Sequence, residues 1–306
     1  MKRSVLVVGE ALIDAVRTPD GAEVHSIGGS PLNVAVGLSR LGSEVELLTH
    51  IGSDENGRTI TAVLEAEGVT LSTSSTTDGA TSVASATIAG DGQPRYRFEV
   101  AWDVKVPGAI IADAVHLGSY AAFLAPGDNA VREVAHAARD AGRLVTLDPN
   151  IRSALLPERS QVVLRFFELL KLTDVVKLSD EDAQYLFPAM SLNDVLDHLL
   201  SCGPRLAIVT RGSAGAEFRT ADASVDRRAE TAEVVDTIGA GDSFMSALIH
   251  KLLATPAPLD QTALEGLARH CVTAAAITVG RRGADPPTSH ELDSALHLNE
   301  ESHDHS

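Results

Sequence analysis

The chain has 306 residues, 44% of them hydrophobic and 4% aromatic, which is enough apolar mass to bury a large core. Its formal net charge is −17 and its longest basic run is Arg281-Arg282, so binding to nucleic acid is not expected. No stretch approaches the ~18 uninterrupted apolar residues of a membrane span. Cys202 and Cys271 match neither a metal-binding nor a disulfide spacing, and two reduced thiols are typical of a cytoplasmic protein.

The first hundred residues alternate between short apolar runs and segments of helical periodicity. Strands are predicted over 5–8 and 44–51, and helices over 31–41 and 56–67, each helix ending at a glycine. The runs 81–88 and 95–102 differ, because only the turn residues Gly90-Asp91-Gly92 separate them. This pattern predicts a β-hairpin outside the main sheet.

From residue 114 the alternation of strands and helices is regular. Strands are predicted over 114–117, 144–147, 175–178, 207–210 and 232–235. Helices are predicted over 129–141, 161–172, 180–186, 240–253 and 259–279. Such alternation indicates an open, mostly parallel α/β sheet with helices on both faces, to which the hairpin adds a small lid. The absence of a repeat or linker favours one domain over 1–298, with 299–306 as a disordered polar tail.

The most informative segment is Asp236-Thr237-Ile238-Gly239-Ala240-Gly241-Asp242, which directly precedes a long predicted helix. Its glycines permit a tight turn whose amides meet at a helix N-terminus, where an anion such as an ATP phosphate is favoured. Asp242 in the first helical turn can then accept the proton of a hydroxyl nucleophile during phosphoryl transfer. Taken alone, the same segment could be an ordinary turn followed by a helix-capping carboxylate.

A second segment, Gly28-Gly29-Ser30-Pro31-Leu32-Asn33-Val34-Ala35, also places paired glycines before a helix. Together the two segments resemble the two signature motifs of the PfkB (ribokinase-like) family of carbohydrate kinases. The resemblance extends over nearly the whole chain, since further matches follow in the expected order: Gly9–Asp14, Leu38–Gly42, Asp148–Arg152, Thr210–Gly215 and Arg281–Ala284. It implies a ribokinase-like three-layer fold whose β lid comprises segments near 10–30 and 80–106.

The resemblance also implies a role for each site residue. Asp242 corresponds to the catalytic base, and the anion hole corresponds to Gly239, Ala240 and Gly241. The residues expected to hold the sugar are Asp14, Gly28, Gly29, Asn33 and Arg152. Those expected at the nucleotide are Thr210, Gly212, Thr237 and Lys177. Structural alternatives remain open, because Asp14 could simply end a strand, Asn33 could cap a helix, and Arg152 could form a surface ion pair.

The expected cofactors are ATP, Mg²⁺ and a monovalent cation such as K⁺. Relatives often carry Asn-x-x-Glu where this chain has Ser179-Asp180-Glu181-Asp182, so Asp182 is expected to reach Mg²⁺ through a water molecule. The same four residues are equally typical of a helix capping box. By resemblance, K⁺ would bind near Asp236 and Ile238, and two copies of the chain would form a homodimer through the lid.

The motif sequences resemble fructokinases most, so the expected reaction is the phosphorylation of fructose to fructose 6-phosphate. A 2-keto-3-deoxygluconate kinase, in which Arg152 would meet the substrate carboxylate, is an alternative, as are kinases of other sugars or nucleosides. A sugar-binding protein without activity is disfavoured because binding alone needs no base. An oxidoreductase is disfavoured because Phe244 occupies the third glycine position of the dinucleotide motif. The lid residues Tyr96, Arg97 and Trp102 are expected to influence the choice of sugar.

Overall fold

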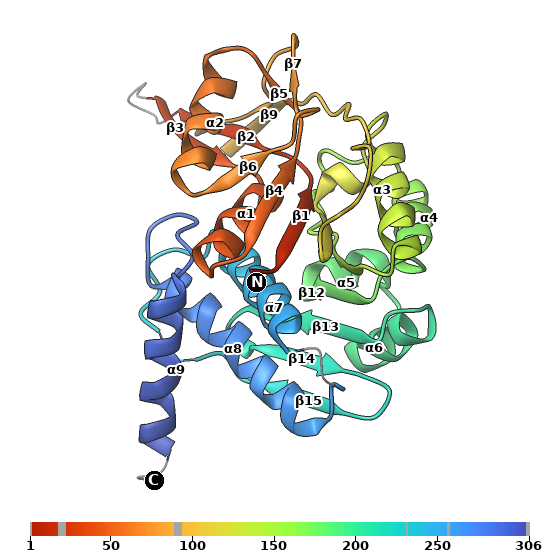
Figure 1. Ribbon diagram of the computed structural model, residues 1–306, viewed down its shortest axis with the longest axis vertical. Coiled ribbons are helices and arrows are strands. Elements are labelled where there is room, and N and C mark those ends of the chain that lie inside the picture. Colours follow the sequence, from red (N-terminus) through yellow and green to blue (C-terminus); the bar gives the residue numbers. More distant parts are fainter. Residues whose placement is uncertain (1, 18–22, 89–93, 231, 256–257, 304–306) are drawn as a thin grey trace.

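A nine-stranded sheet forms the centre of the protein (Figure 1). The computed structural model describes residues 2–17, 23–88, 94–230, 232–255 and 258–303. From one edge of the sheet to the other the strands are β15 (Ser224–Arg227), β14 (Ala216–Arg219), β13 (Leu206–Thr210), β12 (Val175–Ser179), β11 (Leu144–Asp148), β10 (Ala114–Gly118), β1 (Ser4–Val8), β4 (Glu44–Leu48) and β6 (Val69–Leu71). Strands β13 to β6 run parallel to their neighbours, whereas β14 and β15 add an antiparallel edge.

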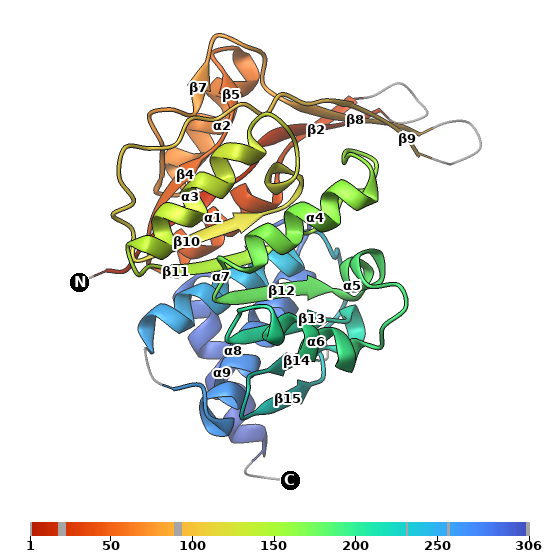
Figure 2. The same cartoon turned by 90° about the vertical axis from the view of Figure 1, so that its right-hand side faces the viewer.

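Helices cover both faces of this sheet (Figure 2). One face carries α3 (Asp128–Asp140), α4 (Arg159–Leu170), α5 (Asp180–Leu186) and α6 (Leu192–Ser201). The other carries α1 (Ser30–Arg40), α7 (Ala240–Ala254) and α8 (Gln261–Val279). Along β1, Val5 and Val7 enter the core on the α1 side, while Leu6 and Val8 enter the core on the α3 side. Burial of both faces explains why the central strands are continuous apolar runs in the sequence.

A second sheet of four strands is built from the segments predicted for the lid and is called the lid sheet below. Its order is β3 (Glu23–Gly28), β2 (Leu12–Arg17), β8 (Val83–Ile88) and β9 (Pro94–Glu99). Strands β8 and β9 pair in an antiparallel manner, as the hairpin pattern predicts, although the predicted turn over 90–92 lies outside the described residues. The second sheet meets the main sheet where β1 ends, because β2 follows after three residues (Figure 1).

The remaining elements are peripheral. Helix α2 (Glu55–Ala66) packs on β6, and α9 (Ser289–His303) packs on α8. Two short strands, β5 (Ile51–Gly52) and β7 (Thr76–Thr77), pair with each other, and single 3₁₀ turns form at Tyr120–Ala122 (η1) and Gly212–Ala214 (η2). Among the described residues we find no helix with the length and hydropathy needed to cross a membrane.

The structure corrects two of the predicted boundaries. The residues from 232 to 235 form no strand, because the segment lies against the end of α8, where the Val235 amide bonds to the Val279 carbonyl, and not beside a strand edge. The side chains of Val234 and Val235 accordingly remain 67% and 55% exposed. Of the predicted disordered tail over 299–306, residues 299–303 belong to α9, and 304–306 lie outside the described residues.

Candidate active site

The site forms where α7 begins. Gly239 precedes the helix with a φ of 77°, a left-handed conformation that glycine adopts without strain. A Cβ at Gly239 would also lie only 2.6 Å from the Cβ of Ala284, so the turn requires glycine for two reasons. This turn places Asp242 in the first turn of α7 with a side chain that is almost completely buried.

Two residues of α1 hold the Asp242 carboxylate. Ser30 Oγ donates to Asp242 Oδ1 at 2.6 Å, and Asn33 Nδ2 donates to Asp242 Oδ2 at 2.8 Å. Burial raises the pKa of Asp242 above its ordinary value, while the hydrogen bonds from Ser30 and Asn33 and the charge of Lys177 oppose that rise. A fixed carboxylate of increased basicity is suited to accept a proton from a hydroxyl group.

The amides at the start of α7 offer an anion site. Within the described part of the chain, the amides of Gly241 and Asp242 have no acceptor, as expected for the first turn of a helix. The Ala240 amide differs, because it donates to the Thr237 carbonyl at 3.3 Å. Of the three residues predicted for the anion hole, Gly241 therefore has a free amide, and the Ala240 amide is already engaged.

A buried ion pair lies beside this anion site. Lys177 Nζ on β12 donates to Asp148 Oδ2 on β11 at 2.6 Å, and both side chains are almost completely buried. A Cβ on Gly241 would lie 3.5 Å from that ammonium group, which brings Lys177 close to the free amides. Burial lowers the pKa of Lys177, but the carboxylates of Asp148, Asp182 and Asp242 outweigh burial and hold it above its ordinary value. The site thus combines a cation with free amides at a helix N-terminus, a combination suited to binding an anion.

Asp182 forms the capping box that was one of its two predicted roles. Its Oδ2 accepts from the Ser179 amide at 2.9 Å, and its own amide donates to Ser179 Oγ at 3.0 Å. Its Oδ1 accepts from the Ile151 amide at 2.7 Å, so the carboxylate also holds the loop after β11. Each oxygen keeps a lone pair, so the carboxylate can still accept from a metal-bound water.

Four residues predicted to hold the sugar lie near one another: Asp14, Gly28, Gly29 and Arg152. Asp14 is on β2, and a Cβ at Gly28 on the paired strand β3 would lie 2.1 Å from Asp14 Oδ2. Burial raises the pKa of Asp14, and the positive charge of Arg152 opposes that rise. A Cβ at Gly29 would lie 2.5 Å from the carbonyl oxygen of Glu10, so this glycine lets α1 approach the end of β1.

Two of the residues predicted for the nucleotide, Thr210 and Gly212, lie at the carboxyl end of β13, whereas Thr237 follows no strand. Thr210 ends β13 as the register partner of Ser179, and Gly212 begins η2 at a position where an added Cβ would meet no atom within 4 Å. Thr237 is exposed beside the turn that begins α7. The carboxyl end of β13, where Thr210 and Gly212 lie, is at the edge of the parallel sheet where open α/β folds bind ligands.

The residues predicted for K⁺ lie in the turn before α7. The Asp236 carboxylate accepts from the Ile238 amide at 3.1 Å and from the Gly283 amide at 2.9 Å, and the Ile238 side chain is exposed. Among the described residues, no group of three or more His, Cys, Asp or Glu side chains is arranged to hold a metal ion.

Sequence reasoning missed four residues that the structure brings to this region: Glu10, Ser30, Tyr120 and Asp148. Glu10, Ser30 and Asp148 stand inside the motifs that carry the family resemblance, but no local pattern indicates their partners. Tyr120 follows a buried strand without any motif. Of the three lid residues expected to influence sugar choice, Trp102 is buried in the core on the α3 side. Arg97 forms an exposed ion pair with Glu99.

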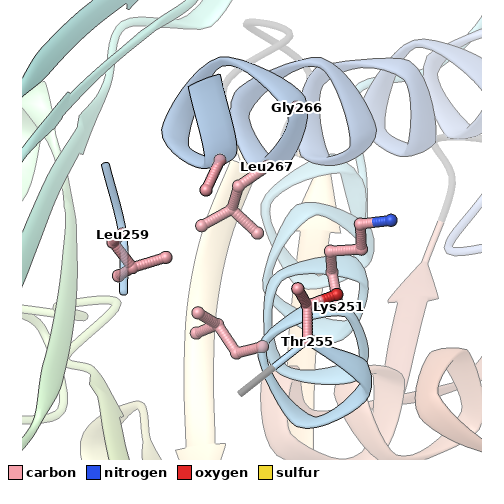
Figure 3. Close-up of a pocket in the computed structure, with 7 residues that line it drawn as sticks. Lys251, Thr255, Leu259, Gly266 and Leu267 are labelled. Atoms are coloured by element: carbon pink, nitrogen blue, oxygen red, sulfur yellow. The ribbon is translucent and has the colours of Figure 1, made fainter. Parts of the chain in front are cut away.

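A cavity of about 170 Å³ lies elsewhere, between α7 and α8 (Figure 3). Its lining includes Lys251 and Thr255 of the α7 end, together with Leu259, Gly266 and Leu267. Because Asp242 is in the first turn of α7 and Lys251 in its last, the cavity is separated from the base by the length of the helix. We therefore assign no substrate to it.

Comparison with known proteins agrees with this geometry. A model of the family described as "pfkB family carbohydrate kinase" matches residues 2–291. The chain belongs to the pfkB family of carbohydrate kinases. Among curated pfkB proteins, it is 32% identical to Fructokinase-1 of Oryza sativa subsp. japonica, over 95% of this chain and 97% of that protein. It is 30% identical to the fructokinase of Salmonella typhimurium, over 93% of this chain and 95% of that protein.

Solved structures of pfkB-type kinases confirm the predicted ribokinase-like fold. The fructokinase of Xylella fastidiosa with bound ATP superimposes with a TM-score of 0.83 at 25% identity, covering 98% of this chain and all of that one. A putative Ribokinase II from E. coli in its apo form superimposes with the same TM-score of 0.83 at 22% identity, covering 97% of this chain and 100% of that chain. At this lower identity the second comparison supports the fold alone.

Proposed function

We propose that this pfkB kinase transfers the γ-phosphoryl group of ATP to a hydroxyl group of fructose and forms fructose 6-phosphate. The observation that carries the proposal is the placement of Asp242, which Ser30 and Asn33 hold beside the free amides of Gly241 and of Asp242 itself. The carboxylate can accept a proton and the amides can bind an anion, and phosphoryl transfer to an alcohol requires both. The identity of about 30% to fructokinases supports fructose as the acceptor.

In the proposed reaction the sugar hydroxyl oxygen attacks the γ-phosphorus while its proton passes to the Asp242 carboxylate. The bond between the γ-phosphorus and the β–γ bridging oxygen breaks, and ADP leaves. The amides at the start of α7 and the ammonium group of Lys177 face the charge that accumulates on the phosphoryl oxygens. Asp14, Asn33, Arg152 and the Gly28-Gly29 segment would orient the sugar, and the lid would exclude water from it.

ATP would extend from this anion site over Thr237, in the turn before α7, and over Thr210 and Gly212 at the end of β13. Mg²⁺ fits the donor set, because it usually binds one or two carboxylates, water and phosphate oxygens and does not need a cage of protein ligands. Asp182 would hold it through a water, and the ion would supply charge neutralisation on the phosphates. The same proposal includes a K⁺ site near Asp236 and Ile238 and a homodimer formed through the lid. It also includes a cytoplasmic location, which the two free thiols favour.

The test is an assay of ADP release with fructose, glucose, ribose, 2-keto-3-deoxygluconate and a nucleoside. We expect turnover with fructose and a loss of about 10²-fold or more in Asp242→Asn, because the amide cannot accept the proton. The Asp242→Asn protein should still bind ATP, which separates loss of the base from loss of folding. Near-normal turnover by Asp242→Asn would refute the assignment of the base.

The second candidate acceptor is 2-keto-3-deoxygluconate, and the exposed guanidinium group of Arg152 near Asp14 is the observation that favours it. If the wild type preferred 2-keto-3-deoxygluconate to fructose in the same panel, and Arg152→Gln lost that preference, then 2-keto-3-deoxygluconate and not fructose would be the acceptor.

A further inference from the structure

Two buried side chains next to the sugar end of the site have a polar atom without a partner. Glu10 is 4% exposed and Tyr120 is 2% exposed. Within the described residues, neither Oε2 of Glu10 nor the hydroxyl group of Tyr120 makes a hydrogen bond. An unpaired buried polar group costs on the order of 1–3 kcal/mol, so two such groups in one place require an explanation.

Both residues lie at the edge of the sheet that carries the site. Glu10 follows β1 after Gly9, and Tyr120 follows β10 after Ser119. Strands β1 and β10 are parallel neighbours with Val8 opposite Leu117, so their carboxyl ends bring Glu10 and Tyr120 together. Open α/β sheets bind ligands at this edge.

Glu10 also lies next to the residues that hold the base. A Cβ on Gly29 would lie 2.5 Å from the Glu10 carbonyl oxygen, and the next residue, Ser30, donates to Asp242. A sugar whose reacting hydroxyl faces Asp242 therefore has its other hydroxyl groups within the neighbourhood of Glu10.

Charge and packing place Tyr120 in the same neighbourhood. The charge of Arg152 acts on the carboxyl groups of both Glu10 and Asp14, and those two carboxyl groups act on the Tyr120 phenol. The Tyr120 ring packs against Leu12 and Ala84 of the lid sheet. Tyr120 is thus at the junction between the lid and the main sheet, on the acceptor side of the site.

We propose that the Tyr120 hydroxyl and the Glu10 carboxyl bind hydroxyl groups of the acceptor sugar and so determine which sugar is phosphorylated. The proposal rests on the proposed sugar kinase function. A phenol hydroxyl both donates and accepts, and a carboxyl oxygen accepts, so a sugar hydroxyl can satisfy either atom. A site with unpaired polar groups discriminates strongly against analogues that lack the matching hydroxyl, because the protein group then stays unpaired.

The surroundings of Glu10 favour a neutral sugar as the occupant. Burial raises the pKa of Glu10 to about 7, against the opposing effects of the Ser119 side chain, the Ala121 amide and the Arg152 charge. With a pKa near neutrality, the carboxyl group can be protonated or ionised, and in either form it can hydrogen-bond to a hydroxyl group of the sugar. A second acidic group on the ligand would have to be balanced by Arg152 alone.

The test compares Tyr120→Phe and Glu10→Gln with Tyr185→Phe as the matched control. Tyr185 is on α5, packs against the core on the α3 side and has its ring under the Arg159 guanidinium group, 5.9 Å away, and it is not among the residues proposed to hold the sugar. For each protein we would measure the melting temperature without ligand, fructose binding by calorimetry, and kcat/KM for fructose and its single-deoxy analogues.

We expect Tyr120→Phe to melt at the same or a higher temperature than the wild type, since the lost hydroxyl was unpaired in the free protein. Its kcat/KM for fructose should fall about 10- to 100-fold, and this loss should vanish with the one deoxy analogue that lacks the contacted hydroxyl. Glu10→Gln should show the same pattern with another analogue, and Tyr185→Phe should behave like the wild type.

Three results would overturn the proposal. These are unchanged kcat/KM in both variants, an equal loss with every analogue, or a lower melting temperature that accounts for the loss. If the wild type binds fructose without phosphorylating it, the proposed function fails, and the binding measurements still decide the role of Tyr120 and Glu10. A wild type that neither binds nor phosphorylates a sugar contradicts both proposals.

Discussion

The basicity of Asp242 is set by a balance between burial and two hydrogen bonds. Burial raises its pKa, while Ser30 and Asn33 donate to the ionised carboxylate and so favour it. The carboxylate must be ionised to act as a base, so kcat/KM should fall as the pH falls through the raised pKa. The activity should therefore decline at a higher pH than an ordinary aspartate would allow.

Removing one of these donors should move the acidic limb of the pH profile. In Ser30→Ala the carboxylate loses the hydrogen bond to Oδ1, so its pKa should rise further and the decline in kcat/KM should begin at a higher pH. The measurement is kcat/KM for fructose as a function of pH. The control is Ser39→Ala on the same helix, because Ser39 donates to the Glu67 carbonyl and not to the base. An unshifted limb in Ser30→Ala would show that Asp242 does not limit the rate at low pH.

Lys177 and Asp148 compensate each other's buried charge through a direct ion pair. Burying either charge alone would be costly, and the pair is tolerated because each charge compensates the other. One oxygen of Asp148 has no partner among the described residues. The ammonium group is thereby held beside Gly241 in the charged state. A cation fixed in advance can stabilise charge on a phosphoryl group without reorganising.

At the scale of elements, the close contact between β2 and β3 positions Asp14. Gly28 leaves room for the Asp14 carboxylate, since a Cβ there would lie 2.1 Å from Oδ2. Helix α1 then starts directly after this strand and carries both donors to Asp242. One short segment therefore connects Asp14, which is proposed to bind the sugar, with Asp242, which is proposed as the base.

We expect Gly28→Ala to displace Asp14 and to raise KM for fructose by about tenfold or more, because a misplaced polar group loses its hydrogen bonds to the substrate. The control is Gly108→Ala, since a Cβ at Gly108 meets no atom within 4 Å. Steady-state kinetics would measure KM for fructose and KM for ATP separately, and so show which of the two substrates the substitution affects. A Gly28→Ala protein with unchanged KM for fructose would contradict the role of Asp14 in sugar binding.

At the scale of the whole molecule, the two sheets differ in how firmly they are held. Strands β10 and β11 are buried between the helices of both faces. In the lid sheet, Leu12, Ile13 and Ala84 are buried against the rest of the protein, whereas the edge strand β9 carries the exposed ion pair of Arg97 and Glu99. A sheet with few buried apolar contacts opens at lower free energy. The lid is therefore the part expected to close over a sugar.

Hydrogen exchange followed by mass spectrometry should show this difference. Without ligand, the amides of β8 and β9 should exchange faster than those of β10 and β11, and fructose should slow the exchange of β8 and β9. The antiparallel strands β14 and β15 at the far edge provide the control, because the sugar should leave their exchange unchanged. Equal slowing at both edges would indicate a general stabilisation and not closure of the lid.

The sequence by itself determined the α/β alternation, the hairpin of the lid and the glycine turn that begins α7. Each of these is recorded locally, in strand or helix periodicity, in turn residues or in a motif. The same local reading wrongly placed a strand over 232–235, because an apolar run does not reveal whether a strand edge lies beside it.

Only the tertiary structure decided how the side chains of the site meet. Ser30 and Asn33 are separated from Asp242 by more than 200 residues of sequence, and Lys177 pairs with Asp148 across two strands. Glu10 and Tyr120 come together because β1 and β10 are neighbours in the sheet although far apart in the chain. Periodicity and motifs indicate the local structure of each segment. Hydrogen bonds and charge interactions form between groups that the packing of distant segments brings into contact.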